Sequence, residues 1–160
     1  MIQAFTETTF ITYISTEDNR LDTSVASTQI RHLFKFINDM DGSIDYAYAS
    51  TQTIYNRYTK FEFRYSTSPD IYTGLVNLIP AGHWKYEVYE VSWIGTVTLS
   101  EDNAPITETQ VLSTAADTKG VVQGLVTKGI LNLTEKSGTE QVQYTQREAP
   151  DSTNYIYYGQ

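Results

Sequence analysis

The chain contains two histidines, His32 and His83, that could serve as a catalytic base. A Ser–His–Asp triad needs an imidazole within hydrogen-bond reach of a hydroxyl, with a carboxylate on its other side. His32 is flanked by aromatic residues on a predicted core face, and His83 lies in a predicted turn. We therefore interpret His32 as a packed imidazole and His83 as a turn residue. We predict no catalytic residues and no enzymatic activity.

Acidic residues gather between Asp39 and Asp45, in a segment that includes the pair Asp41-Gly42. Calcium prefers several carboxylate and carbonyl oxygens close together, but this segment lacks the third alternate acid and the terminal bidentate acid of an EF-hand loop. An Asp-Gly pair is also a hairpin signal, because glycine readily adopts positive φ. We therefore predict a hairpin turn, and neither a metal nor a cofactor.

The chain is acidic and contains no cysteine: eleven basic and nineteen acidic residues give a net charge of −8. A chain of this charge is repelled by phosphate backbones and anionic lipid. The nearest basic group, Arg57, Lys60 and Arg64, is interleaved with Glu62. We expect no nucleic-acid partner, no disulfide and no thiolate metal site. No apolar run approaches the roughly 20 residues that span a bilayer, so we expect no membrane association.

Thirteen tyrosines, together with abundant Thr, Ser, Val and Ile, indicate strands with half-buried faces. Nine segments have apolar–polar alternation with turn signals between them, which is typical of a sandwich or barrel. The predicted strands are residues 8–15, 30–37, 44–49, 58–65, 71–79, 84–93, 94–99, 121–134 and 140–146. We predict one all-β domain over residues 1–160, an antiparallel β-sandwich of eight or nine strands, Ig-like or jelly-roll-like.

Residues 30–37 fit two patterns. Read with period two, one face carries Ile30, His32, Phe34 and Phe36. Read as a helix, one stripe carries Ile30, Leu33, Phe34 and Ile37. We favour the strand, because a helix would leave Phe36 exposed and because Asp41-Gly42 then forms a hairpin turn.

Residues 84–93 carry apolar side chains on both faces in turn. Trp84, Tyr86 and Val88 share one face, whereas Val91 and Trp93 lie on the other with Tyr89. The apolar parity shifts near Val88, which predicts a β-bulge or a change of partner there.

Two segments are candidates for contacts with other subunits. Residues 100–120 form a long polar loop, and such loops are usually functional or disordered. The tail at residues 154–160 is short and aromatic. Its four apolar residues are candidate interface residues that could add as a strand to a neighbour: Tyr155, Ile156, Tyr157 and Tyr158. A docked last strand and a mobile loop are the alternatives.

Residues 78–90 resemble part of Ig-like and fibronectin-like sandwiches. A leucine, a Pro/Gly turn and then an aromatic residue open a strand of alternating Tyr and Val, with Trp84 as the corner aromatic and Tyr86 as the next inward position. The missing cysteine pair argues against an antibody-type domain.

The order of segments over residues 54–134 resembles small virion proteins of tailed bacteriophages. An aromatic strand at residues 58–63 precedes the Pro-Ala-Gly-aromatic strand, and residues 128–133 close the domain. This resemblance implies a non-enzymatic structural protein located in the virion and folded in the host cytoplasm. It would be a capsid-associated decoration subunit, or alternatively a neck or tail protein, oligomeric and bound to other virion subunits.

Two other functions stay open. Exposed tyrosines could stack on sugar rings in a carbohydrate- or receptor-binding module, although half-buried tyrosine is also an ordinary feature of sheet surfaces. A hydrolase built on paired carboxylates also stays open, although no local pattern favours any two of the acids.

Overall fold

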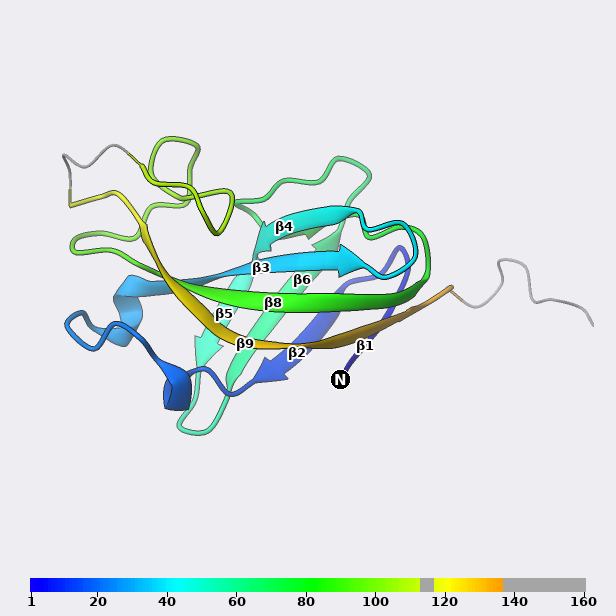
Figure 1. The fold of residues 1–160 in the computed structure, drawn as a ribbon, viewed down its shortest axis with the longest axis horizontal. Coiled ribbons are helices and arrows are strands. Elements are labelled where there is room, and N and C mark those ends of the chain that lie inside the picture. Colours follow the sequence, from blue (N-terminus) through cyan, green and yellow to red (C-terminus); the bar gives the residue numbers. More distant parts are fainter. Residues whose placement is uncertain (113–116, 137–160) are drawn as a thin grey trace, which may run out of the picture.

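A computed structural model describes residues 1–112 and 117–136 of the chain (Figure 1). This part contains nine strands and two short 3-10 helices, η1 (Glu17–Asn19) and η2 (Ser27–Gln29). The strands are β1 (Ile2–Phe5), β2 (Phe10–Ile14), β3 (Ile30–Asn38), β4 (Ile44–Tyr48), β5 (Thr51–Ile54), β6 (Thr59–Tyr65), β7 (Leu75–Val76), β8 (Gly82–Ser92) and β9 (Val121–Thr134).

The strands form two sheets that pack face to face. One sheet has the order β1-β9-β8-β3-β4, and the other has the order β2-β6-β5, with β7 beside β6. The four neighbours β9-β8-β3-β4 and the three neighbours β2-β6-β5 have the strand order of an immunoglobulin variable-type sandwich. The all-β sandwich is thus confirmed, with one correction: β1 pairs with β9 and β6 with β7 in parallel, so the sheets are mixed.

Aromatic side chains fill the space between the two sheets. Phe34 on β3 lies 4.9 Å from Phe61 and 4.8 Å from Phe63 on β6, measured between ring centroids. Phe10 on β2 stacks on Phe63 at 5.2 Å. Because alternate residues of each strand point inward, one phenylalanine every second residue lines the core. This cluster joins β2, β3 and β6 without the disulfide found in antibody domains.

Several predicted details are confirmed. Residues 30–37 are a strand, and Asp41-Gly42 closes the hairpin to β4 with Gly42 at φ 74°. The predicted irregularity near Val88 is present: the register between β8 and β9 shifts after Val88 and again after Glu90. The extra residues lie on β9, which therefore bends along β8.

Two predicted strands differ from the structure: residues 71–79 pair over a short part only, and residues 94–99 form no strand. Of residues 71–79 only Leu75–Val76 pairs, because residues 70–74 form a tight turn in which Asp70 accepts hydrogen bonds from the backbone N–H of Tyr72 and the hydroxyl of Thr73. Gly74 has φ 74° there, and a Cβ at this position would lie 2.1 Å from the backbone nitrogen of Ser50.

Residues 94–99 are not a strand either, because the chain leaves the sheet after Ser92. The short strands β1 and β5 were not predicted. The predicted strand at residues 140–146 and the tail at residues 154–160 lie outside the described residues.

Candidate functional site

Residues 93–112, which we call the strap, cross the outer face of the five-stranded sheet without forming a strand. Trp93 and Ala104 are fully buried with Leu33 on β3 and Tyr48 on β4, in a second apolar cluster outside the main core. The indole N–H of Trp93 donates to the Asn103 carbonyl at 3.2 Å. The predicted polar loop is therefore an ordered cover over most of its described length.

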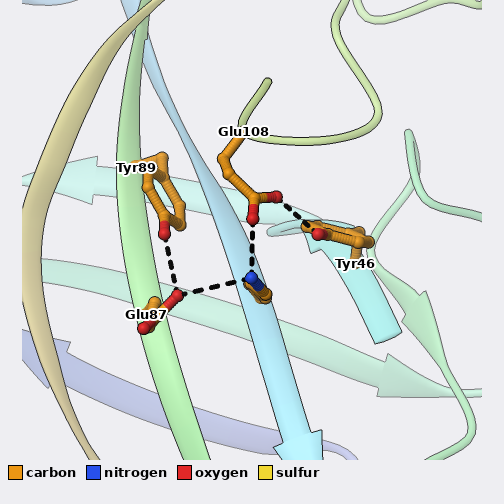
Figure 2. A network of polar contacts seen from close by, with 5 residues as sticks. Tyr46, Glu87, Tyr89 and Glu108 are labelled. Atoms are coloured by element: carbon orange, nitrogen blue, oxygen red, sulfur yellow. Dashed lines mark hydrogen bonds and ion pairs between the residues drawn. The ribbon is translucent and has the colours of Figure 1, made fainter. Parts of the chain in front are cut away.

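A polar network fastens the strap to the sheet (Figure 2). Lys35 Nζ on β3 lies 2.6 Å from Glu108 Oε1 on the strap and 3.7 Å from Glu87 Oε2 on β8. The Tyr46 hydroxyl on β4 donates to the second oxygen of Glu108 at 2.5 Å. The Tyr89 hydroxyl donates to Glu87 at 2.8 Å. Glu108 on the strap is thus bonded directly to β3 and β4, and Lys35 connects it to Glu87 on β8.

In this network the pKa values of Lys35, Tyr46, Tyr89 and Glu108 move away from neutrality. The hydrogen bond with Glu108 raises the pKa of Lys35. Burial, and then the hydrogen bond to Glu87, raise the pKa of Tyr89 to about 12. Burial alone would raise the pKa of Glu108, but hydrogen bonds from Lys35 and Tyr46 outweigh it and lower that pKa. A general acid or base works best with a pKa near the operating pH, so this network is suited to holding the strap rather than to moving protons.

A cavity of about 270 Å³ lies between the strap and the start of β9. Its lining includes two ionisable side chains, Glu108 and Lys119. Glu108 is bound to Lys35 and Tyr46, and Lys119 Nζ donates to the Asp102 carbonyl. Both charged groups of the cavity therefore already have partners.

His32 is the packed imidazole that the sequence predicts. It is 2% exposed, and its ring meets Phe61 edge-on at 5.4 Å. Gln52 Oε1 accepts hydrogen bonds from the backbone N–H of His32 and, in the tautomer protonated at Nδ1, from its ring, both at 3.2 Å. Burial lowers the pKa of His32 to about 4, against the opposing effect of the Gln52 hydrogen bond.

The other sequence candidates lie apart from His32. His83 is exposed and lies in the first residues of β8, so its assignment to a turn was wrong. Asp39 forms an ion pair with Lys85 at 2.5 Å, and Asp41 accepts the backbone N–H of Ser43 at 2.8 Å. Within residues 1–112 and 117–136, no three His, Asp or Glu side chains are grouped as metal ligands.

Sequence reasoning missed Glu90, which is 1% exposed. Its two carboxylate oxygens accept the backbone N–H groups of Leu21 at 3.0 Å and Asp22 at 2.7 Å. Glu90 therefore fastens the polar loop between β2 and β3 to the sheet. Alternation along the strand was the available signal. Glu90 is an even number of residues from the buried Trp84, Tyr86 and Val88, so its side chain points to the same face of the sheet.

The outer edge of β9 is open over most of its length. β9 runs from Val121 to Thr134, but β1 pairs only with residues 131–134. Figure 1 shows β1 beside the end of β9 alone. Residues 121–130, which we call the free edge, have no strand on their outer side within the described part of the chain. Val121, Leu125 and Ile130 on this edge are large, exposed apolar residues.

Among the described residues, the free edge is the longest stretch of strand edge without a partner. A strand edge without a partner presents rows of N–H and C=O groups that pair with an added strand. The free edge spans ten residues, or roughly 33 Å at 3.3 Å per residue. The terminal strands β4 and β5 of the two sheets have only five and four residues.

The four predicted interface residues, Tyr155, Ile156, Tyr157 and Tyr158, lie outside the described residues. In the described part of the chain, no helix is long and apolar enough to cross a membrane. Comparison of the chain with family models, curated proteins and solved structures gave no match. Function is therefore inferred from the geometry of the free edge, the strap and the exposed aromatic residues.

Proposed function

We propose that this chain is a non-enzymatic structural subunit that joins neighbouring subunits by strand addition at the free edge of β9. The observation that carries the proposal is the length of that edge: residues 121–130 continue a strand already held by β8, yet have no strand on the outer side within residues 1–112 and 117–136. Because β8 fixes the edge in an extended conformation, an incoming segment bears most of the ordering cost.

The segment that we propose as the incoming strand is Tyr155–Tyr158 of a neighbouring copy. Its four apolar residues in extended form cover roughly 13 Å, so the free edge accommodates them together with flanking residues. Every second side chain would face the exposed Leu125 and Ile130 side of the edge. Aromatic pairs with aliphatic residues across strands each contribute roughly 0.2–1 kcal/mol.

The assembly that we propose is the virion of a tailed bacteriophage, on the basis of the resemblance over residues 54–134. A decoration subunit on the capsid is the first position, and a neck or tail protein is the second. The expected genetic context is a gene beside those for a portal, a major capsid protein or a tail protein. A gene cluster for polysaccharide degradation would contradict this part of the proposal.

The test is to remove residues 154–160. The shortened chain is expected to keep the circular dichroism spectrum and melting temperature of the full chain, because the described core ends before this segment. It is expected to sediment as a monomer and not to incorporate into the assembly that the full chain forms. A matched control replaces the same seven residues with a Gly/Ser sequence of equal length. Normal assembly of the shortened chain would exclude this role for the tail.

A further inference from the structure

Three exposed tyrosines meet on the outward side of the smaller sheet, and we call this group the tyrosine face. Tyr13 on β2 is 60% exposed, and Tyr55 and Tyr58 in the turn between β5 and β6 are 45% and 39% exposed. The ring centroids of Tyr13 and Tyr58 are 5.4 Å apart, and those of Tyr55 and Tyr58 are 4.9 Å apart. These three rings are in mutual contact, whereas exposed apolar residues on protein surfaces are normally scattered singly.

The backbone holds these three rings in place. Tyr13 alternates with the buried Thr12 and Ile14, and therefore points away from the core. The backbone N–H of Tyr55 donates to the Tyr58 carbonyl at 2.9 Å, which closes the β5–β6 turn and brings the two rings together. Because β2 and β6 are paired, Tyr13 is fixed beside the same turn. The site is thus formed before any ligand arrives, which lowers the entropy cost of binding.

The three rings form a corner rather than a flat surface. The planes of Tyr55 and Tyr58 are inclined at 38°, and those of Tyr13 and Tyr58 at 82°. The rings are therefore inclined to one another and form no single flat platform. A single six-membered ring fits such a corner better than the broad surface of a standard protein interface, which buries about 800 Å² per partner.

Basic side chains accompany the rings. Lys60 is the register partner of Tyr13 on β6, and Arg57 lies in the same turn as Tyr55 and Tyr58. Within the described residues, neither Lys60 nor Arg57 forms an ion pair. The site thus offers charged donors from Lys60 and Arg57, together with tyrosine hydroxyls that donate and accept hydrogen bonds.

We propose that the tyrosine face binds a neutral glycan through one pyranose ring, a function beyond the structural role proposed above. The C–H face of a pyranose packs on the negative face of a tyrosine ring. Its hydroxyl groups both donate and accept hydrogen bonds, which matches Lys60 as donor and the tyrosine hydroxyls as donors and acceptors. Polyanions such as nucleic acids or acidic polysaccharides fit poorly, because the chain carries a net charge of −8.

The test is a titration of the full chain with neutral hexasaccharides, namely cello-, malto-, manno-, xylo- and chito-oligosaccharides, followed by NMR and calorimetry. At least one is expected to bind and to shift signals of residues 13, 55 and 58, with little dependence on salt. Tyr13→Ala and Tyr58→Ala are each expected to weaken binding at least about tenfold, which corresponds to 1.4 kcal/mol. Tyr13→Phe, which keeps the ring, is expected to retain binding.

The matched control is Phe5→Ala, which removes a comparably exposed ring from β1 in the other sheet. It is expected to leave glycan binding unchanged. The proposal is overturned if no sugar binds at millimolar concentration, or if the two tyrosine variants bind as the parent does. It is also overturned if binding is confined to anionic polymers and disappears in salt, or if the face instead mediates contact with a protein. Deleting residues 154–160 is expected to leave glycan binding intact, so this proposal fails independently of strand addition.

Discussion

The five-stranded sheet differs between its two ends: the strap covers its outer face near β3 and β4, whereas the described residues leave most of its β9 edge unpaired. Toward β4 and β3, the strap covers the outer face, buries Trp93 and is fastened by the ion pair of Lys35 with Glu108. Toward β9, residues 121–130 keep a bare edge with exposed apolar side chains at Val121, Leu125 and Ile130. One sheet therefore has an outer face that the strap covers and an edge, residues 121–130, that has no strand partner within the described residues.

This contrast is the basis of the proposal that the chain adds a strand at β9. Native proteins protect strand edges with short strands, charges or covering loops, because a bare edge pairs with other chains. The chain uses a long irregular segment to cover its outer face near β4, and its other terminal strands have four or five residues. Within the described residues no strand covers residues 121–130 of β9, and the protective features of this edge are Lys128 and the two extra residues of the strand. We interpret this edge as a contact surface rather than as a defect.

The largest difference between the two sides is expected in stability. Trp93→Ala should lower the free energy of unfolding by about 3–5 kcal/mol, because it removes a fully buried ring that the strap packs with Leu33 and Tyr48. Ile130→Ala on the free edge should change it by less than about 0.5 kcal/mol. Urea denaturation of both variants measures the contrast. Similar losses in the two would show that the edge is packed and not free.

A second prediction concerns how the buried His32 makes the free energy of unfolding depend on pH. The pKa of His32 is about 4 in the folded chain and about 6.5 when unfolded, so below pH 6.5 the unfolded state binds a proton that the folded state rejects. Lowering the pH from 7.5 to 5 should therefore cost about 2 kcal/mol of stability. Denaturation at several pH values measures this slope. The control variant His83→Gln should keep this dependence of stability on pH. If the dependence persists in His32→Phe, another group is responsible for it.

The fastening of the strap should have a smaller effect. Glu108→Gln removes the charge that pairs with Lys35, and we expect it to cost roughly 1 kcal/mol because both side chains are only partly shielded from water. The same change should speed hydrogen exchange of strap amides, including that of Gln110. Glu101→Gln, an exposed acid on the strap, is the matched control. Equal effects of the two variants would indicate a general charge effect.

The smallest stability effect is expected at the free edge. Ile130→Lys should leave the free energy of unfolding within about 0.5 kcal/mol of the parent, because the side chain is half exposed. It should nevertheless weaken self-assembly, since lysine on an edge strand opposes strand addition. Sedimentation velocity over a concentration series gives the association constant. Unchanged association would place the contact elsewhere.

Alternation along the sequence was sufficient to predict the long strands. Phe61 and Phe63 on β6, and Phe34 and Phe36 on β3, face the core as their spacing indicates. The shift of parity at Val88 also marked the actual irregularity. These features are local, because each side chain points according to its own position along an extended segment.

The sequence did not reveal which strands pair or that the strap covers the sheet, because both depend on contacts between residues far apart in the chain. β1 has four residues, too few for a clear alternation, and its position is set by β9 at the other end of the described chain. Residues 94–99 alternate like a strand, but Val97 and Leu99 pack against the second apolar cluster, which includes Tyr48, and the segment pairs with no strand. The tyrosine face was expected only as exposed tyrosines in general, since Tyr13 and Tyr58 become neighbours through the pairing of β2 with β6.

Hydrogen exchange at the free edge tests the central claim most directly. In the chain ending at residue 153, outward amides within residues 121–130 should exchange rapidly. Addition of a synthetic peptide of residues 152–160 should slow them, while the amides of β4 stay unchanged. Protection of the free edge before the peptide is added, or peptide-induced protection at β4 in place of β9, would contradict the proposal that β9 receives the incoming strand.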